Sequence, residues 1–308
     1  MFKDPDFFKK VKNQKVLILL SIPFVVYVII FCYVPLFGWL MAFQNYKPRT
    51  GILHSKFVGL DNFKFLFTNQ NGVFVKVIRN TLAMGLINLV LGTIFAIAFA
   101  ILLSEFRFLF GKKIIQTISY MPHFLSMVIV TGIVYDVCRM ENGMLNTFLN
   151  SIGVLDHNVA WLEEKSYFWW IVGITNLWKE TGWNSIIYLA AITSINPDLY
   201  EAASIDGAGR LKRIWHITLP GLKPTIIILL IMNIGNVLNA GFEIQYMLGN
   251  GIVQEVSQTI DIYVLKYGIG KGNYSLGTAA GIFKSLVSIV LIAVSNFAAK
   301  RMGEESLY

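Results

Sequence analysis

The most informative part of this chain is the segment Glu201-Ala-Ala-Ser-Ile-Asp-Gly-Ala-Gly-Arg-Leu-Lys-Arg-Ile-Trp-His-Ile-Thr-Leu-Pro220. It is a polar stretch, interrupted by glycine, between two long apolar runs. It follows the pattern Glu-Ala-Ala, three residues, Gly, nine residues, Ile-x-Leu-Pro. A polar segment of this length between two apolar runs indicates a structured loop that stands outside a membrane.

The loop should contain two short helices joined by a bend. At 196–198, Asn-Pro-Asp starts the first helix, because Asn caps the helix end, Pro suits the first helical position and Asp complements the helix dipole. This helix is expected to end near Ile205. Residues 206–209, Asp-Gly-Ala-Gly, have turn chemistry. A second short helix is expected over 210–217, until the prolines that follow stop it.

The bend offers a surface that a partner protein can hold. Three small side chains let a partner backbone approach closely: Ala202, Ala203 and Ala208. Charged side chains surround them: Glu201, Asp206, Arg210 and Arg213. A short helix seated in a groove of another protein is a recurrent recognition mode. The alternative is an ordinary helical hairpin loop without a partner.

The composition is that of a membrane protein. Of 308 residues, 55% are hydrophobic and only 14% are charged, and the mean hydropathy is +0.60. The net charge of +8 does not indicate nucleic-acid binding, because the basic residues flank apolar runs and form no single patch. Six runs are long enough to span a lipid bilayer as helices. They lie near residues 16–42, 80–103, 114–135, 167–193, 224–246 and 277–299.

The fold class that follows is an all-α, polytopic membrane protein with six transmembrane helices in a single domain, residues 1–308. If the N-terminus is cytoplasmic, the inside segments carry fourteen of the 26 Lys and Arg residues and the outside segments carry ten. The excess favours this orientation. Both termini and the loop at 196–220 are then expected on the cytoplasmic side of the cell membrane.

Polar residues at membrane depth indicate functional sites by default. In the fourth span, Asn176, Glu180 and Asn184 recur every four residues and share one helical face, with Trp183 beside them. Lys179 and Glu180 point about 100° apart on a helix, so we expect them to be poor partners for each other. Lys179 is hypothesised to attract an acidic sugar such as a uronate.

The fifth span carries a second polar face. Asn233, Asn236, Asn239 and Glu243 recur every three or four residues. Amide and charged groups exchange hydrogen bonds with sugar hydroxyls, and Trp stacks on sugar rings. Both faces therefore suit a wet passage for sugars, although Asn residues also link membrane helices to each other.

No catalytic or metal-binding constellation is present in the sequence. The four histidines are scattered, and none has a metal-ligand spacing. No Gly-x-x-x-x-Gly-Lys-[Ser/Thr] motif occurs, so the chain is not expected to hydrolyse ATP alone. The two cysteines, Cys32 and Cys138, make no disulfide framework.

The Glu-Ala-Ala segment resembles the coupling loop of binding-protein-dependent ABC-importer permeases with the type I (MetI-like) fold. The chain looks closest to the LplB-like polysaccharide and oligosaccharide permeases of the carbohydrate-uptake group. Less specific motifs extend the resemblance over nearly the whole chain. They are Phe57-Val-Gly-Leu-Asp-Asn-Phe63, Trp178-Lys-Glu-Thr-Gly-Trp183, Tyr188-Leu-Ala190, Thr278-Ala-Ala-Gly-Ile-Phe-Lys284 and Gly303-Glu-Glu-Ser-Leu-Tyr308. Family loops often carry an aromatic residue where Ile214 stands here.

The resemblance implies that this chain is one subunit of a larger transport complex. This chain would pair with a second, homologous permease, two ATPase subunits that bind ATP and Mg, and an extracytoplasmic solute-binding protein. The residues implied in ATPase coupling are Glu201, Ala202, Ala203, Asp206, Gly207, Ala208, Gly209, Arg210, Leu219 and Pro220. The function implied is ATP-driven import of an oligosaccharide or polysaccharide fragment. An importer for a peptide or polyol, a membrane sensor or scaffold without transport, and a membrane enzyme are the alternatives.

Overall fold

The computed structural model describes residues 14–68, 72–301 and 303. The first four lysines and the C-terminal motif beyond Gly303 lie outside the described residues. Contacts divide the chain into two compact units. The first comprises Met1–Leu66 and Val264–Ile282, and the second comprises Phe67–Tyr263 and Phe283–Tyr308.

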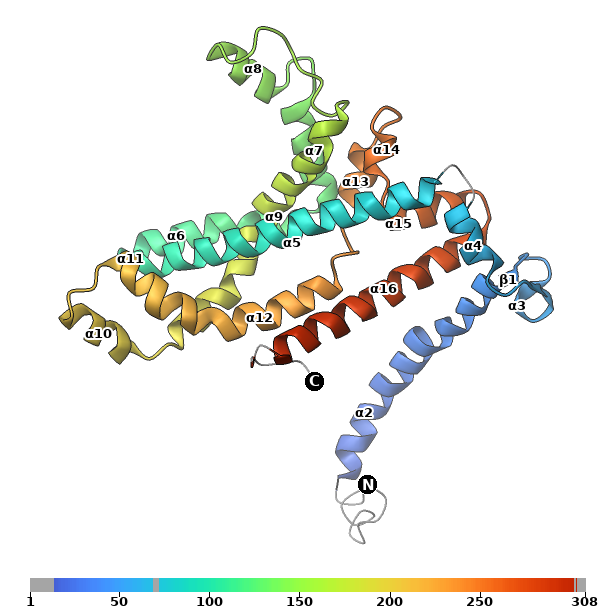
Figure 1. Cartoon of the computed structure of the whole chain (residues 1–308), viewed down its shortest axis with the longest axis horizontal. Coiled ribbons are helices and arrows are strands. Elements are labelled where there is room, and N and C mark those ends of the chain that lie inside the picture. The colour runs from blue at the N-terminus through green and yellow to red at the C-terminus, as the bar shows by residue number, and fades with distance from the viewer. Residues whose placement is uncertain (1–13, 69–71, 302, 304–308) are drawn as a thin grey trace. The chain divides into compact units, whose positions relative to one another are not determined.

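In the first unit, one continuous helical run forms the first predicted span (Figure 1, blue). It consists of α2 (Lys15–Val28), the π-helical turn η1 (Ile29–Tyr33) and the 3-10 helix η2 (Val34–Phe43). The run has 29 residues, and no residue of its most apolar window is buried. An apolar helix with exposed side chains on every face is typical of a helix that lies in lipid or against another membrane protein.

The residues that follow this run form a small folded segment. β1 (Gln44–Asn45) pairs antiparallel with β2 (Lys56–Phe57), and α3 (Gly51–His54) and α4 (Asp61–Thr68) adjoin them. The Asn62 amide donates to the carbonyl oxygens of Ala42 at 2.9 Å and Gln44 at 3.0 Å. The motif that contains Asn62 therefore fastens α4 to the end of the first span.

The second unit is built on two long helices that lie along each other (Figure 1). α5 (Val73–Glu105) contains the second predicted span, and α9 (Lys165–Thr193) contains the fourth. α9 also packs tightly against the end of α6, because a Cβ at Gly182 would lie 2.1 Å from the Ser119 carbonyl oxygen. Glycine is the residue type that allows this approach.

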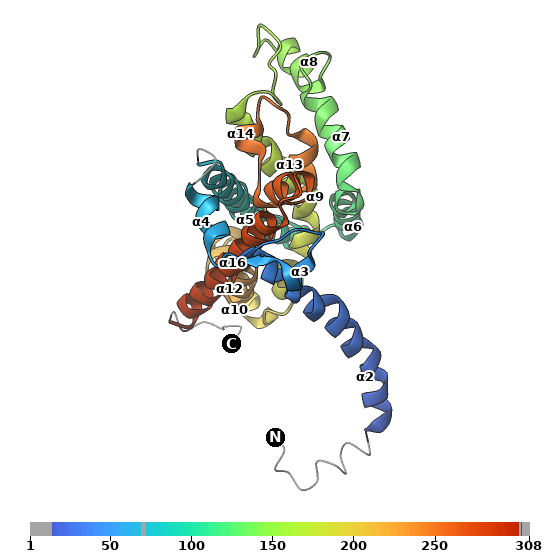
Figure 2. The same ribbon diagram turned by 90° about the vertical axis from the view of Figure 1, so that its right-hand side faces the viewer.

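The third predicted span, 114–135, is wrong as a single helix. α6 (Leu109–Tyr120) and a 3-10 turn, η4 (Met121–Phe124), are followed by α7 (Met127–Cys138), with a bend of 100°. Figure 2 shows α7 turning away from α6. Pro122 breaks the helix, because its ring lacks an N–H and restricts the residue before it. Ser126 then caps α7 by accepting from the Ile129 amide at 3.4 Å.

The fifth predicted span, 224–246, is also wrong as a single helix. α12 (Leu219–Gly235) ends, a turn covers residues 236–242, and α13 (Glu243–Leu248) starts in a new direction. Asn236 and Asn239 favour turns, and Gly241 has a φ of +98°, which glycine adopts without strain. The buried amide of Gln245 donates to the Ala240 carbonyl oxygen and holds the turn against α13.

The remaining segments complete the two units. In the second, α8 (Met144–Ser151) follows α7, and α14 (Gln254–Ser257) and α15 (Ile260–Tyr263) follow α13. The π-helical η6 (Val264–Gly270) belongs to the first unit, and the long α16 (Tyr274–Arg301) contains the sixth predicted span. Lys284 of α16 binds both carboxylate oxygens of Asp261 in α15, at 2.7 and 2.8 Å.

Length and hydropathy support most of the predicted spans. Four helical runs of the described residues can cross a membrane, and the bent pair α6–α7 would be a fifth. α9 is not among them, although its 29 residues reach about 43 Å at 1.5 Å per residue. Its polar residues lower its hydropathy. All six predicted segments are helical at least in part. Five of them contribute to a run that is long and apolar enough to cross a membrane, if the bent pair is counted as one run.

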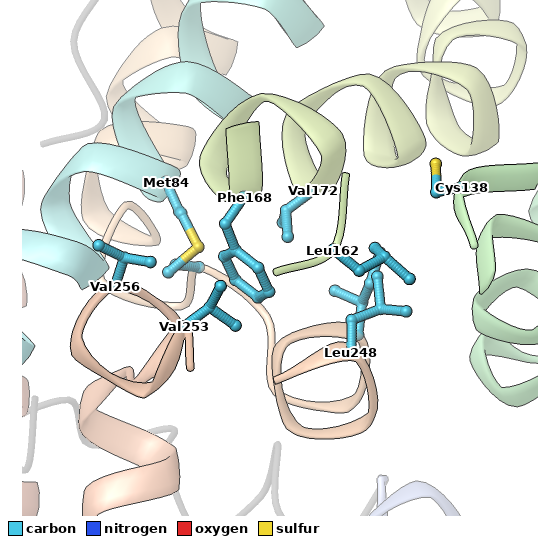
Figure 3. Close-up of a cluster of buried hydrophobic side chains, with 10 residues drawn as sticks. Met84, Cys138, Leu162, Phe168, Val172, Leu248, Val253 and Val256 are labelled. Atoms are coloured by element: carbon cyan, nitrogen blue, oxygen red, sulfur yellow. The ribbon is translucent and has the colours of Figure 1, made fainter. Parts of the chain in front are cut away.

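A hydrophobic core joins the segments of the second unit (Figure 3). Met84 from α5 and Phe168 from α9 lie at its centre, with Val253 from the segment before α14. All three are almost completely buried. This core fixes the turn after α12 and the segment around α14 against the two long helices.

Glu255 of α14 is clamped by two lysines. Its carboxylate binds the ammonium groups of Lys76 in α5 and Lys165 at the start of α9, each at 2.8 Å. The hydrogen bond from Lys165 and then that from Lys76 lower the pKa of Glu255 to about 2. Behind this clamp, the buried Asn80 amide donates to the carbonyl oxygen of Glu255 at 2.8 Å.

The clamp predicts a pH-dependent stability. The pKa of Glu255 is lower in the folded protein than its ordinary 4.5, so its stabilising effect is present above that pH and is lost as the pH falls toward 2. Glu255→Gln is expected to lower Tm at neutral pH, and the difference from the wild type should vanish near pH 2. Thermal unfolding followed by circular dichroism measures this. Asp156→Asn, at an exposed carboxylate outside the clamp, is the control, and a difference that persists at pH 2 contradicts the account.

Candidate functional site

The first half of the loop at 196–220 folds as its sequence predicts. α10 spans Pro197–Ile205. The side-chain oxygen of Asn196 accepts from the amide of Asp198 at 3.0 Å, which satisfies one free donor of the first helical turn. Pro197 occupies the first turn, where no N–H is needed.

The bend after α10 depends on Gly207. This residue has a φ of +71°, in the left-handed region. The amide of Ala208 donates to the Ala203 carbonyl oxygen at 2.8 Å, and the amide of Gly207 donates to that of Ser204 at 3.2 Å. This pair of bonds is a Schellman motif, which ends a helix with glycine in the left-handed position. The predicted turn at 206–209 is confirmed.

The second half of the segment corrects the prediction. α11 (Arg210–Arg213), the π-helical η5 (Ile214–Thr218) and α12 follow without a break, and together they form a run of 26 residues. Pro220 and Pro224 do not stop it. Pro220 lies in the first turn of α12, and membrane helices tolerate proline when the remaining hydrogen bonds are kept. The second predicted helix of the loop is thus the start of the fifth span.

Two side-chain contacts hold the arms of the bend together. The hydroxyl groups of Tyr200 in α10 and Thr218 in η5 lie 3.0 Å apart. The Arg213 guanidinium donates to the Ser204 hydroxyl at 3.0 Å. α10 is therefore fixed to the base of α12, so that a force on α10 acts on the fifth span.

The surface of the bend is exposed and partly apolar. Glu201, Asp206 and Arg210 are exposed, whereas Arg213 is half-buried. Ile205 is 87% exposed and Leu211 is 74% exposed. Large apolar side chains on a polar loop are typical of a protein–protein contact.

A second candidate site lies among α5, α9, α12 and the turn that follows α12. Two cavities, of about 290 and 220 Å³, share the lining residues Asn88, Gly92, Asn184 and Asn239. Glycine at position 92 leaves space beside the amides, because a Cβ there would meet no atom within 4 Å. Because they share these four residues, the two cavities form one region, which is lined by amide groups and by apolar side chains.

The fourth-span residues meet in this region. Asn176, Glu180 and Asn184 of α9 all line the smaller cavity. The Asn176 amide donates to the side-chain oxygen of Asn88 in α5 at 3.3 Å. This hydrogen bond links α9 to α5, so Asn176 and Asn88 both connect the two helices and line the cavity.

The polar residues of the fifth predicted span do not form the single helical face that was predicted. Asn233 lies near the end of α12, and Asn236 and Asn239 lie on the turn after it, so they share no helical face. All three line the larger cavity. Glu243 starts α13, is exposed, and lines neither cavity.

Lys179 and Glu180 do interact, against our expectation. The Lys179 ammonium lies 3.3 Å from a carboxylate oxygen of Glu180. The expectation considered only the directions of the two Cβ atoms. The long Lys side chain is flexible, so its ammonium group can curve back to the neighbouring carboxylate. Lys179 is buried and lines neither cavity, and Trp183 also lies outside them.

Asn88 is the residue that the sequence analysis missed. It lines both cavities and accepts from Asn176. The sequence contained a signal for this residue. Asn88 lies inside an apolar run, and a polar side chain at membrane depth is costly and indicates function, as it did for the polar residues of the fourth span.

The chemistry of the region is that of amide groups. Among the described residues, six Asn side chains line the two cavities, and Glu180 is the only charged residue that does so. Each amide both donates and accepts hydrogen bonds, as a sugar hydroxyl does. Among the described residues, no group of three His, Cys, Asp or Glu side chains is placed to hold a metal ion.

Comparison with known proteins places the chain in a family. Residues 88–304 match the family described as "Binding-protein-dependent transport system inner membrane component". The chain belongs to this family of membrane permeases, and the all-α permease fold is confirmed.

Its relatives include carbohydrate permeases. YteP of Bacillus subtilis (strain 168), a polygalacturonan/rhamnogalacturonan transport system permease protein, is 41% identical over 97% of this chain and 92% of its own. LplB of the same organism is 40% identical over 96% and 92%. A bacterial alginate ABC transporter, solved with an alginate pentasaccharide-bound periplasmic protein, contains a chain with a TM-score of 0.89 and 35% identity. The match covers 98% of this chain and 100% of that one.

Proposed function

We propose that this chain is a permease subunit of an ATP-driven importer, and that its Asn-lined cavities form part of the path of an oligosaccharide. The observation that carries the proposal is the convergence of six Asn side chains from two helices, one helix end and a turn. Four of them, at 184, 233, 236 and 239, are exposed in the isolated chain. Amides at membrane depth are costly unless a polar ligand or water meets them, so the region is expected to hold one or the other.

The cargo is an oligosaccharide with uronate units. Amides match its hydroxyls, and the apolar side chains beside them, such as Ile187 and Leu229, can contact the apolar faces of its rings. YteP is named for polygalacturonan and rhamnogalacturonan, and the similar solved transporter is described with alginate. A peptide or polyol importer, and a sensor without transport, remain the alternatives that the uptake experiments separate.

Partner subunits supply the energy. A second permease completes the path, a solute-binding protein delivers the cargo from outside, and two ATPase subunits bind ATP and Mg. The exposed bend at 196–209 contacts an ATPase subunit on the cytoplasmic side, where both termini also lie. The positive charge of the flanking segments supports this orientation.

The geometry suggests how closure of the ATPases would move the path. The Tyr200–Thr218 and Ser204–Arg213 contacts transmit a displacement of α10 to η5 and α12. α12 carries Asn233 and leads directly into the turn with Asn236 and Asn239. A shift of α12 would therefore change the cavity lining, as alternation between two states requires.

Filling the path tests the proposal. Asn184 lines both cavities, so Asn184→Phe is expected to reduce uptake at least tenfold, through lost hydrogen bonds and lost space. Ile174→Phe is the control, because Ile174 lies on the same helix, is 59% exposed and lines neither cavity. ATP-dependent uptake of a labelled oligogalacturonate into proteoliposomes with the whole complex measures both. Normal uptake by an assembled Asn184→Phe complex would contradict the proposed path.

A further inference from the structure

A charged cluster lies directly behind the smaller cavity. It is formed by Lys179, Glu180 and Trp183 of α9 and by His123 of η4. Glu180 lines the cavity, whereas the other three side chains do not. The cluster therefore joins the wall of the path to the break between α6 and α7.

The Lys179 ammonium has all its donors engaged. It donates to the His123 carbonyl oxygen at 2.6 Å and to that of Pro122 at 3.4 Å, and lies 3.3 Å from the Glu180 carboxylate. Its side chain is only 8% exposed. A lysine in such a position does not reach cargo, and it acts on the path through Glu180.

The Glu180 carboxylate is held from two sides. One oxygen faces Lys179, and the other lies 2.7 Å from Nδ1 of His123. For an ionised carboxylate this contact requires a proton on Nδ1, so the ring donates. The His123 ring is stacked on Trp183, with centroids 4.3 Å apart and planes inclined by 2°, which fixes its orientation.

The arrangement has an electrostatic consequence for cargo. Glu180 is one-third exposed, and within the part of the chain that the structure describes it is the only charged residue that lines the two cavities. An anionic cargo that touches this wall meets a like charge, and at contact distance inside a protein such repulsion changes a rate by tenfold or more. The buried Lys179 charge is close enough to cancel it.

We propose that Lys179, from outside the cavity, neutralises Glu180 and thereby lets an anionic oligosaccharide pass this carboxylate. The inference rests on the proposed function. Lys179 is then a positioning residue that sets specificity for cargo charge. Glu180 keeps its acceptor oxygens for sugar hydroxyls without presenting a net negative charge.

The test compares two cargoes that differ in charge. Proteoliposomes with the complete complex take up tetragalacturonate or its fully methyl-esterified form, at mildly alkaline pH and with saturating binding protein. The readout is the ratio of the maximal rates for the charged and the neutral cargo. Lys179→Met should lower this ratio about tenfold, Lys179→Arg should retain it, and Glu180→Gln should raise it.

The double variant separates charge from structure. Lys179→Met with Glu180→Gln still lacks the bonds to the Pro122 and His123 carbonyls, but no bare carboxylate remains, so the ratio should return at least to that of the wild type. If Lys179→Met slows both cargoes equally, or if the double variant keeps the low ratio, the proposal is overturned. If the Lys179→Met complex does not assemble, the rate ratio of the Glu180→Gln variant is the deciding measurement. An unchanged ratio in the Glu180→Gln variant overturns the proposal. A wild type that takes up neither cargo overturns the proposed function instead.

Discussion

Gly207→Val is expected to reduce ATP-driven uptake about tenfold while the complex still assembles. Gly207 has a φ of +71° at the end of α10, where a residue with a Cβ pays about 1–2 kcal/mol and a β-branched residue is worst placed. The Schellman bonds of Ala208 and Gly207 would weaken, and α10 would no longer be held at its angle to the fifth span. ATP hydrolysed per sugar taken up should rise.

Gly207→Asn is the matched control for this variant. Asn adopts the left-handed conformation more readily than other residues, and a Cβ at this position meets no atom within 4 Å. Uptake by this variant should stay within about twofold to threefold of the wild type. If both variants transport normally, the bend does not position the coupling surface, and that part of the account is wrong.

Gly85→Ala is expected to destabilise the protein by about 3 kcal/mol, at the upper end of the cost of overpacking. A Cβ on Gly85 would lie 1.9 Å from the Val237 carbonyl oxygen, so that backbone must move. Val237 belongs to the turn that carries Asn236 and Asn239, and the change would therefore alter the cavity as well. Tm in detergent should fall by roughly 10 °C.

Gly92→Ala controls for the loss of a glycine from the same helix. Gly92 also lies on α5 and lines both cavities, yet a Cβ there meets no atom within 4 Å. Its Tm should equal that of the wild type or exceed it by a few degrees, because alanine favours helix over glycine by up to about 1 kcal/mol. Equal Tm values for both variants would contradict the close packing of α5 on the turn.

The coupling bend shows what a single sequence can predict. The cap at Asn196, the extent of α10 and the turn at Gly207 all follow from signals within a few residues, and the structure confirms them. Local hydrogen bonds determine these features, so no knowledge of the rest of the fold is needed.

The broken spans show where the same approach fails. Pro122 and Gly241 are both helix breakers, but a span is recognised by composition averaged over about 20 residues, which conceals one or two exceptions. The position of each break also depends on tertiary contacts. Gln245 holds the turn after α12, and Lys179 binds the carbonyl groups of η4, and neither contact can be deduced from periodicity.

The candidate path was predicted in part. Asn176, Glu180 and Asn184 share one face of α9 because helical periodicity places them there, and that face does line a cavity. Which of the other polar residues join them depends on where α12 ends. This is why Asn233 lines the region while Glu243, ten residues on, does not.

The proposed function is that this permease takes up sugar with energy from partner ATPases. The most direct measurement is ATP-dependent accumulation of labelled cargo in proteoliposomes that contain the complete complex and its binding protein. The cargoes are oligouronates, neutral oligosaccharides, peptides and polyols. An oligouronate should accumulate, and only when ATP is supplied on the side of the membrane that carries the bend at 196–209. An assembled complex that hydrolyses ATP but accumulates no sugar, or that accumulates a peptide or polyol instead, would contradict it.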